Sequence, residues 1–557
     1  MNYRRTKRRH SRMGRSVFPI LWAVVLIVVT TAACSNVEPA GGNVGVQSER
    51  TASGNVPAFD GLLAAADLHE QPSTVYYEIF VRSFYDSNGD GIGDLRGVTE
   101  KLDYLRELGI GGIWLMPIQP SPSYHGYDVT DYYEVNPEYG TMEDLKELLD
   151  EAHRRGIKVL MDLVVNHTSS EHPWFQAAAA DADSPYRSWY TWAEPGQKLA
   201  TDGATGSNPW HSSGNDHYLG VFWEGMPDLN FDNPEVRAEM IKIGQFWLKQ
   251  GFDGFRLDAA KHIYEDFKSN AASQEVKEKN KAWWQEFRAG LNEVNPNAYL
   301  VGEVWDTTAT IGPYLNQALD SCFNFDLAKT ILSNARSEKA SDIGFALSRS
   351  YQFYKESSQG TFIDAIFLTN HDQNRVMSEL DGKVEHAKMA ASILLTLPGN
   401  PFIYYGEEIG MLGMKPDERI REPMVWAETD DSSAGTGQTA WMPAFYNKDG
   451  GSSVSTQLQD PDSLLHHYRK MIQWRNEHAV LQNGDIVSYN ANNASVLAYA
   501  RITNQEKALV LHNLSGERQS VAVRDTSFST LALASGTGAK LSDGQLDLPP
   551  YSTVLLK

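Results

Sequence analysis

Two carboxylates stand at the ends of two short strand-like segments of this chain. Asp258 closes the segment 251–258, and Glu303 closes the segment 299–303. Where strands and helices alternate in a barrel, the strand ends are where catalytic groups gather. One acid and one nucleophile are the minimum that hydrolysis of a glycosidic bond requires. The pair therefore indicates chemistry at a glycosidic bond.

The neighbours of the two carboxylates predict different roles for them. Arg256 lies two residues before Asp258, so both side chains share one face of the strand. A guanidinium beside a carboxylate favours its ionised form, as a nucleophile requires. Glu303 instead lies between Val301 and Val304, an apolar setting of the kind that keeps a carboxylic acid protonated. We therefore expect Asp258 to be the nucleophile and Glu303 the general acid and base.

Strand-like segments alternate with amphipathic helical ones from residue 75 onward. The strand-like segments are 75–82, 109–117, 157–166, 252–258, 298–304, 321–326, 365–370 and 401–406. They predict an α/β fold, a (β/α)₈ TIM barrel made of residues 70–167 and 235–478. Residues 168–234 are too long for a loop and predict an inserted domain after the third strand. The short alternating runs in residues 479–557 predict a C-terminal antiparallel β-sandwich.

The N-terminus predicts export. Residues 1–33 carry basic residues and then an apolar run, which is typical of a signal peptide. The small residues before Cys34 resemble the lipobox of bacterial lipoproteins, so we expect lipidation of Cys34, with an uncleaved membrane-spanning anchor as the alternative. Residues 34–69 predict a flexible tether. The enzyme is then a cell-surface lipoprotein attached to the bacterial membrane, or a secreted protein.

Charge and cysteine content narrow the classes of partner. The chain of 557 residues has a net charge of −22, which argues against nucleic-acid binding because that requires a basic face. Its hydrophobic content of 41% is that of a globular protein. Only Cys34 and Cys322 are present, and Cys322 lies in a buried-looking strand, so we expect no disulfide. We expect a monomer.

Six segments, taken in chain order, resemble the α-amylase superfamily of glycoside hydrolases. They are the Asp-rich loop beginning at Asp86 and the segments 162–167, 226–230, 254–262, 302–305 and 368–372. The resemblance covers about residues 70 to 557, with similarity to the oligo-1,6-glucosidase and neopullulanase groups. It implies an α-glucan substrate and a retaining mechanism through Asp258 and Glu303.

The same resemblance implies roles for further side chains. Asp372 is a third acid that binds sugar hydroxyls, and Tyr127 stacks on the sugar that is cleaved at its anomeric carbon. His167 and His371 donate hydrogen bonds to that sugar. Lys261 and His262 line the leaving-group side. Taken singly, each has an ordinary structural interpretation, such as a helix-capping Asp or a packed Tyr.

The loop 86–94 has the ligand spacing of a calcium site. Carboxylate and amide oxygens stand at its positions 1, 3, 5 and 9 with glycine at position 6, but position 12 is Gly97, so the loop is not an EF-hand. We expect one Ca²⁺, bound by Asp86, Asn88, Asp90, Asp94 and the carbonyl of Ile92. The alternative is an Asp- and Gly-rich turn without metal. The resemblance also implies a second ion near Asn166, which is common in α-amylases; for this chain we name Asn166 as a ligand and leave a site without that ion as the alternative.

The loop before Tyr127 bears on the type of cleavage. Exo-acting glucosidases of this family carry an Asp there that pairs with an Arg and closes the non-reducing end of the site. This chain has a candidate arginine, Arg421. Residues 123–125 of the loop are Ser-Tyr-His, so the loop has no Asp at that position. Without that carboxylate, the non-reducing end of the site has less reason to be closed. An open cleft admits an internal segment of a glucan chain, so we favour endo-hydrolysis of α-1,4 bonds. The alternatives are an oligo-1,6-glucosidase, a neopullulanase or maltogenic hydrolase, and a non-catalytic membrane-anchored relative, which the three acids disfavour.

Overall fold

The computed structural model describes residues 73–427, 437–448 and 452–557. These all belong to one compact unit of the chain, residues 61–557. The predicted signal peptide, the tether and the lipidation of Cys34 lie outside the described residues and stay predictions. Across the three described ranges, no helix has the length and apolar character needed to cross a membrane.

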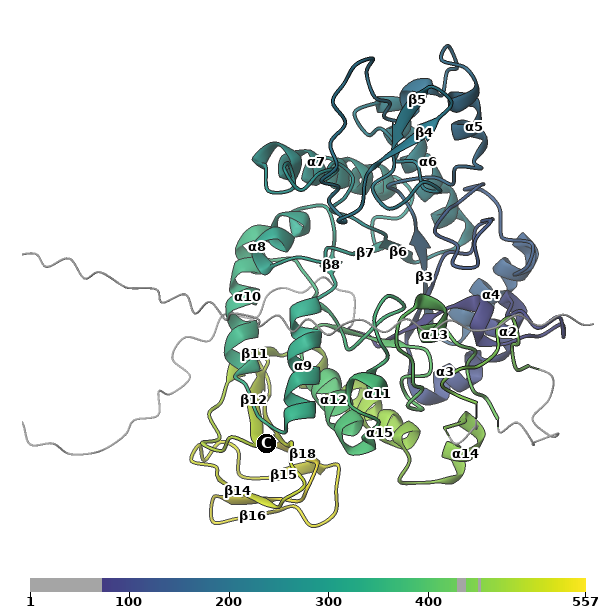
Figure 1. Ribbon diagram of the computed structural model, residues 1–557. Coiled ribbons are helices and arrows are strands. Elements are labelled where there is room, and N and C mark those ends of the chain that lie inside the picture. Colours follow the sequence, from purple (N-terminus) through teal and green to yellow (C-terminus); the bar gives the residue numbers. More distant parts are fainter. Residues whose placement is uncertain (1–72, 428–436, 449–451) are drawn as a thin grey trace, which may run out of the picture. The chain divides into compact units, whose positions relative to one another are not determined.

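Eight parallel strands form the central sheet (Figure 1). In chain order they are β1 (Tyr76–Ile79), β2 (Gly112–Leu115), β3 (Lys158–Leu163), β6 (Gly254–Leu257), β7 (Tyr299–Gly302), β8 (Ser321–Cys322), β9 (Ala365–Phe367) and β10 (Asn400–Tyr404). The sheet order is β8-β7-β6-β3-β2-β1-β10-β9, and a parallel bridge between Phe323 and Ala365 joins its two ends. Each predicted strand-like segment overlaps one of these strands.

The helices between the strands cover the sheet. They are α1 (Val81–Phe84), α2 (Leu95–Glu100), α3 (Leu102–Leu108), α4 (Met142–Arg154), α6 (Pro234–Gln250), α7 (Gln274–Asn292), α8 (Thr308–Ile311), η2 (Gly312–Leu315), α9 (Phe325–Ser337), α10 (Ile343–Ser358), α11 (Val376–Glu379) and α12 (Val384–Thr396). After β10 follow α13 (Asp417–Ile420), α14 (Val454–Gln459), α15 (Leu464–Glu477) and α16 (Ala479–Asn483).

Local sequence sets the ends of these helices. Thr141 and Asp144 form a reciprocal capping box at the start of α4, which satisfies two otherwise unpaired backbone donors. Asn233 caps α6, and Pro234 occupies its first turn, where a missing N–H costs nothing. Gly251 ends α6 with φ of 118°, a conformation that favours glycine. The chain therefore turns directly from α6 into β6.

Aromatic and branched side chains fill the barrel interior. One buried cluster contains Tyr76, Trp114, Tyr299, Phe323 and Phe402 from different strands, and the rings of Tyr76 and Phe402 stack with centroids 4.8 Å apart. Such packing makes the barrel a solid core rather than a pore. Functional side chains are therefore confined to its rim, where the strands end.

The segment after β3 forms a separate small layer over the carboxyl ends of the strands. It holds α5 (Pro173–Ala180), η1 (Arg187–Trp189) and a hairpin of β4 (Trp210–Ser213) and β5 (Asp216–Leu219). Figure 1 shows α5, β4 and β5 together. Two tryptophans of this segment differ in exposure: Trp210 is buried in the segment's own core, whereas Trp223 is 44% exposed.

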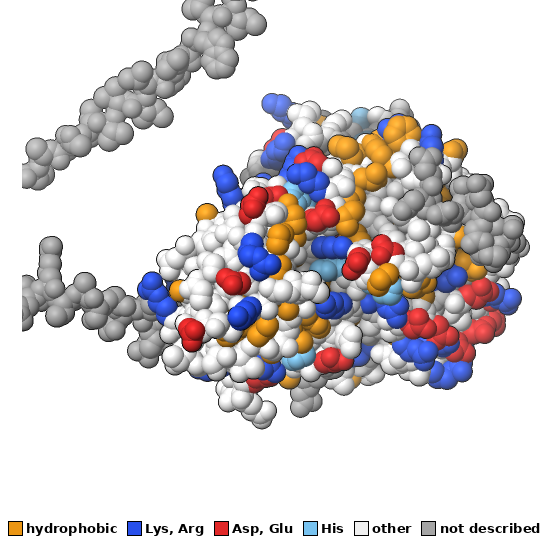
Figure 2. Space-filling model, turned by 90° about the horizontal axis from the view of Figure 1, so that it is seen from below, with side chains coloured by type: hydrophobic (Ala, Val, Ile, Leu, Met, Phe, Trp, Pro, Cys, Tyr) orange, Lys and Arg blue, Asp and Glu red, His pale blue; other side chains and the backbone are white. Residues whose placement is uncertain are grey.

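The C-terminal region consists of antiparallel strands. One sheet has the order β11 (Asp485–Ser488), β12 (Val496–Ile502), β13 (Lys507–Asn513), β18 (Ser552–Leu556) and β15 (Leu531–Ala534); the other has β14 (Gln519–Ala522), β17 (Gln545–Leu548) and β16 (Lys540–Ser542). Buried Arg501 ties this region to the barrel by donating to the carbonyl of Thr396. The predicted (β/α)₈ barrel with a C-terminal antiparallel domain is confirmed. Figure 2 shows acidic and basic side chains interspersed on the face seen from below.

Candidate active site

The barrel gathers the three predicted catalytic acids at one rim. Asp258 directly follows β6, Glu303 directly follows β7, and Asp372 lies in the segment after β9. All three strands are parallel, so their carboxyl ends meet at the same end of the barrel. Asp162, within β3, contributes a fourth carboxylate close to them.

The guanidinium of Arg256 lies at the centre of this group. Its Nη1 is 2.6 Å from Oδ1 of Asp258 and 2.9 Å from Oδ1 of Asp162, and its Nη2 is 2.7 Å from Oε2 of Glu303. Arg256 is fully buried, which strengthens charge-assisted hydrogen bonds and makes an unpaired charge costly. One arginine thus orients three carboxylates. The predicted contact between Arg256 and Asp258 is present.

The predicted contrast in surroundings between the two main carboxylates is only partly present. Burial raises the pKa of Asp258 while Arg256 opposes that rise, and burial raises the pKa of Glu303 against the same guanidinium. The apolar setting expected for Glu303 is therefore incomplete, because a residue on the neighbouring strand reaches it. Strand alternation within one segment could not reveal a contact made across two strands.

The backbone after the nucleophile candidate also points at Glu303. Ala259 has φ of 46°, in the left-handed region that non-glycine residues rarely adopt. In this conformation its N–H donates to Oε2 of Glu303 at 3.2 Å. Backbone strain of this kind is concentrated at functional sites.

A second chain of contacts joins Tyr127, His371 and Asp372. The Tyr127 hydroxyl is 2.6 Å from Nε2 of His371 and donates to Oδ2 of Asp162 at 3.0 Å. Nε2 of His371 also lies 3.2 Å from Oδ2 of Asp372. On its other side, Nδ1 of His371 is 2.5 Å from Oε1 of Glu78 in β1. His371 is therefore held between two carboxylates.

These partners decide the protonation of His371. Burial alone would lower its pKa, but Asp372 and Glu78 raise the pKa of His371 to about 10. Burial would likewise raise the pKa of Asp372, yet His371 and then Arg421 hold the pKa of Asp372 well below its usual value. At neutral pH the site thus contains an imidazolium and an ionised carboxylate side by side.

Arg421 packs against Asp372 and defines the far end of the site. Its Nη2 lies 2.8 Å from Oδ1 of Asp372 and 3.4 Å from Oδ2 of Asp417. Tyr124 lies over this region, with its ring stacked on that of Trp441 at 5.3 Å between centroids. Asp128 is the carboxylate nearest in sequence to Tyr124 and Tyr127. It accepts hydrogen bonds from two serines of its own loop rather than pairing with Arg421.

The remaining predicted residues lie around this centre. Lys261 donates to the carbonyl of Trp305 and to Asp306, on the side of Glu303. His262 packs edge-on against Phe222, and burial lowers the pKa of His262 to about 4. His167 is 3.1 Å from the carbonyl of Tyr127, and burial lowers the pKa of His167 to about 4. Both histidines are therefore neutral near pH 7.

The candidate calcium loop is closed by hydrogen bonds to its own backbone. Asp86 accepts from the N–H groups of Asn88, Gly89 and Gly91, and Asp90 accepts from that of Ile92. Asp94 binds Ser87 and caps α2. These are the Asx turns of the alternative interpretation, although the donors are the hard oxygens that calcium prefers.

Among the described residues, no three His, Cys, Asp or Glu side chains converge as metal ligands. At the second predicted position, the amide nitrogen of Asn166 donates to Oδ1 of Asp228 at 3.1 Å. Asp228 also accepts from the N–H of Val221. Both predicted calcium positions therefore stay predictions.

Sequence reasoning missed three residues of this network: Glu78, Asp162 and Trp441. Glu78 and Asp162 carried a usable signal, because each is an acid inside an otherwise apolar strand and is almost fully buried. Such an acid normally requires a partner. Trp441 carried no such signal, since it reaches the site from a segment far along the chain.

Two known protein families match this chain. Residues 78–484 match the family model described as Alpha amylase, catalytic domain, and residues 496–555 match the Alpha-amylase SusG C-terminal domain. The crystal structure of an α-amylase from H. orenii aligns with a TM-score of 0.80 at 46% identity, covering 87% of this chain and 99% of that chain.

Curated relatives carry several activities. The chain is 45% identical over 487 residues to Alpha-amylase 3 of Dictyoglomus thermophilum, covering 87% of this chain and 93% of the relative. It is 34% identical to an oligo-1,6-glucosidase of Parageobacillus thermoglucosidasius, covering 79% and 90%. It is 35% identical to a 4-alpha-glucanotransferase of Thermotoga maritima, covering 79% and 96%.

Proposed function

The chain belongs to the α-amylase family of glycoside hydrolases, and from that premise we propose that it is an endo-acting α-amylase. Its substrates are starch, glycogen and maltooligosaccharides, which it cleaves at internal α-1,4-glucosidic bonds with retention of configuration. The relatives of this chain include glucosidases and transferases, so the choice depends on this chain's own loops.

The endo assignment depends on the partners of Arg421. Arg421 pairs with Asp372 and with Asp417 four residues before it, both on its own side of the site. The opposite loop presents Tyr124 to it rather than a carboxylate, with the guanidinium 6.0 Å from the ring centroid. An aromatic ring can carry a sugar over it, whereas an Arg–Asp pair across the site would stop the chain there. The far end therefore supports an internal stretch of glucan.

The proposed reaction has two steps that use the same pair of carboxylates. Asp258 attacks the anomeric carbon, and the bond to the leaving oxygen breaks as Glu303 gives that oxygen its proton. Glu303, now ionised, takes a proton from water, and the water oxygen then displaces Asp258. Arg256 contacts both carboxylates, so it can balance the negative charge as it passes from one to the other.

The carboxylate of Asp372 beside this pair suits the substrate's hydroxyl groups, and the fully buried His371 holds that carboxylate ionised. Asp372 is one-third exposed and can accept a hydrogen bond from a sugar hydroxyl. Tyr127 stacks on His371 with an interplanar angle of 15°, so the aromatic wall is rigid before substrate arrives. Fixed groups cost less to organise in the transition state.

Calcium belongs to the proposal as a structural ion. Members of this family commonly bind it, and the loop 86–94 offers carboxylate, amide and carbonyl oxygens. When bound, the ion would stiffen the turn between β1 and α2. We propose Asp86, Asn88, Asp90, Asp94 and the Ile92 carbonyl as its ligands.

A time course of products from soluble starch tests the function. Long oligosaccharides early in the reaction support endo-hydrolysis, and release of glucose alone would refute it. Isomaltose, pullulan and cyclodextrin distinguish the oligo-1,6-glucosidase and neopullulanase alternatives. Asp258→Asn should abolish hydrolysis of maltooligosaccharides; full activity in that variant would refute the mechanism and would fit a site elsewhere.

A further inference from the structure

Four side chains at the far end of the site form a closed cycle of contacts. The indole of Trp441 stacks on the ring of Tyr124, with centroids 5.3 Å apart and 22° between the planes. The guanidinium of Arg421 lies 6.0 Å from the centre of the Tyr124 ring. The Ser83 hydroxyl closes the cycle, because it accepts from Nε1 of Trp441 at 2.8 Å and donates to the carbonyl of Arg421 at 2.6 Å. We call these four residues the far-end cluster.

Ser83 fixes the indole of Trp441 in one orientation. Ser83 is fully buried in α1, and it gives its one hydroxyl proton to the carbonyl of Arg421, so the oxygen is left to accept from the indole N–H. An indole has a single donor with a single direction. The backbone carbonyl of Ser83 also accepts from the N–H of Met424 at 2.8 Å. One buried residue thus holds both the indole and the backbone around Arg421.

The rest of the indole packs against residues that directly follow β1. The ring of Phe80 meets it edge-on, with centroids 6.0 Å apart and 87° between the planes. The guanidinium of Arg82 lies 5.7 Å from the indole centre. Both arrangements are among the favourable ones for aromatic rings and cations. The indole of Trp441 therefore lies between the barrel rim and Tyr124, and connects the two.

The segment that leads to this indole is bound to the loop 86–94. The carbonyl of Gly437 accepts from the N–H of Asp86 at 3.0 Å, and the N–H of Ala440 donates to the carbonyl of Gly91 at 2.7 Å. Two backbone hydrogen bonds fix the course of the segment on the barrel loop. The position of the indole is therefore set by the barrel before any substrate arrives.

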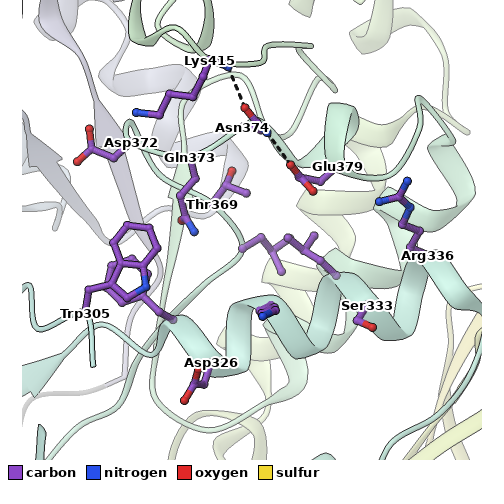
Figure 3. Close-up of a pocket in the computed structure, with 14 residues that line it drawn as sticks. Trp305, Asp326, Ser333, Arg336, Thr369, Asp372, Gln373, Asn374, Glu379 and Lys415 are labelled. Atoms are coloured by element: carbon purple, nitrogen blue, oxygen red, sulfur yellow. Dashed lines mark hydrogen bonds between the residues drawn. The ribbon is translucent and has the colours of Figure 1, made fainter. Parts of the chain in front are cut away.

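Arg421 connects the far-end cluster to one of the three acids. Its guanidinium contacts Asp372, which lines a cavity of about 620 Å³ (Figure 3). The segment before Arg421 is held as well, because the N–H of Lys415 donates to the side chain of Asn374, a bond that is dashed in the same figure. The far-end cluster therefore borders space that is open to a ligand.

These contacts give Trp441 a role that it exerts through a neighbour. We propose that Trp441 is a positioning residue: anchored by Ser83, it holds Tyr124 as a fixed platform for the glucan chain at the far end of the site. This inference rests on the proposed function, in which Tyr124 carries a sugar. A ring that is already ordered costs less to organise when substrate binds. Trp441 therefore lowers KM and leaves kcat largely unchanged.

Removing the indole tests the inference. Trp441→Ala should raise KM for maltoheptaose by about three- to tenfold, the effect of one aromatic contact, and keep kcat within about twofold of the parent. Trp441→Phe keeps a ring for Tyr124 and should raise KM less. Ser83→Ala releases the indole N–H and should also raise KM. Trp189→Ala removes another half-buried indole, which packs on Trp174, and should keep the parent KM.

A double-mutant cycle distinguishes positioning from direct contact with substrate. In the Tyr124→Ala background, Trp441→Ala should change KM by less than about twofold, because no ring is left to position. A rise as large as that in the parent background would overturn the inference, and so would an unchanged KM in Trp441→Ala alone. If Trp441→Ala does not fold, Ser83→Ala takes its place in the cycle.

One further measurement keeps this inference separate from the proposed function. If the parent does not hydrolyse maltoheptaose, the proposed function is refuted, and crystal structures of the parent and of Trp441→Ala decide the positioning alone. A Tyr124 ring that is displaced in Trp441→Ala supports the inference. A Tyr124 ring in the same place in both structures overturns it.

Discussion

The carboxylate of Glu78 and the imidazole of His371 form a buried pair that links the first and seventh strands of the barrel, with 2.5 Å between Oε1 and Nδ1. Both side chains are almost fully buried. Because Nε2 of His371 faces Asp372 and Tyr127, Glu78 controls the charge of a group at the reaction centre without reaching the reaction centre itself. Glu78 is thus a positioning residue.

Glu78→Gln should move the alkaline limb of the pH profile to lower pH. Glu78 raises the pKa of His371, so the neutral amide allows His371 to lose its proton earlier as pH rises. We expect kcat/KM to begin falling at least about one pH unit lower than in the parent. The measurement is kcat/KM on maltoheptaose across the pH range. An unshifted alkaline limb would contradict the role, and the exposed Glu134→Gln serves as the control.

Arg256→Lys should weaken catalysis while keeping the buried positive charge. Arginine contacts Asp162, Asp258 and Glu303 through two separate nitrogens, whereas an ammonium group is a single point. We expect kcat to fall by at least about 100-fold. The ammonium keeps the positive charge but loses the hydrogen bond to Oδ1 of Asp258, so the pKa of Asp258 should rise and move the acid limb to higher pH. An acid limb at the parent position would show that the hydrogen bond from Arg256 does not hold Asp258 ionised.

Calcium removal should lower thermal stability through the loop 86–94. Excess ion at about 100 times its Kd stabilises the folded state by about 2.7 kcal/mol, so a chelator should lower the Tm of the parent. Asp90 is exposed, and Asp90→Ala should remove most of this response. Asp131→Ala removes a similar exposed Asx turn elsewhere and should retain it. If the chelator leaves the Tm of the parent unchanged, the loop 86–94 is a turn without metal.

Glu407 should make the protein less stable as pH rises. Burial raises the pKa of Glu407 to about 8; Oε1 accepts from Tyr468, and Oε2 has no hydrogen-bond partner among the described residues. An acid whose pKa is higher in the folded protein than in the unfolded chain contributes its full stabilisation at a pH below its unfolded-state pKa. That stabilisation is lost as the pH rises through the folded-state pKa. Between about pH 4.5 and pH 8, Glu407 should therefore cost the parent about 1–3 kcal/mol.

Glu407→Gln is neutral throughout and should flatten this dependence. Chemical denaturation at several pH values gives the free energy of unfolding for each variant. Glu385 on α12 is exposed, so Glu385→Gln should keep the parent slope. Identical slopes for the parent and Glu407→Gln would mean that Glu407 is ionised in the folded protein without cost.

Much of the fold followed from patterns that are local in the sequence. Each of the predicted strand-like segments overlaps one barrel strand, because short apolar runs between amphipathic helices leave few other arrangements. Asp258 and Glu303 were identified for a similar reason: a polar residue at the end of a buried strand has a definite place in a barrel. Residue type and position along one strand were sufficient for these inferences. Asp372 followed only from the resemblance to the α-amylase superfamily.

The contacts that decide charge and shape are made between strands, and only the tertiary structure determines them. Arg256 was expected beside Asp258 but also reaches Glu303 on the next strand, which removes the apolar isolation expected there. Glu78 meets His371 across 293 residues of sequence, and Trp305 stacks on Phe325, which begins α9. A residue's type is fixed by the chain, but its neighbours across strands depend on register and closure, which no local spacing encodes.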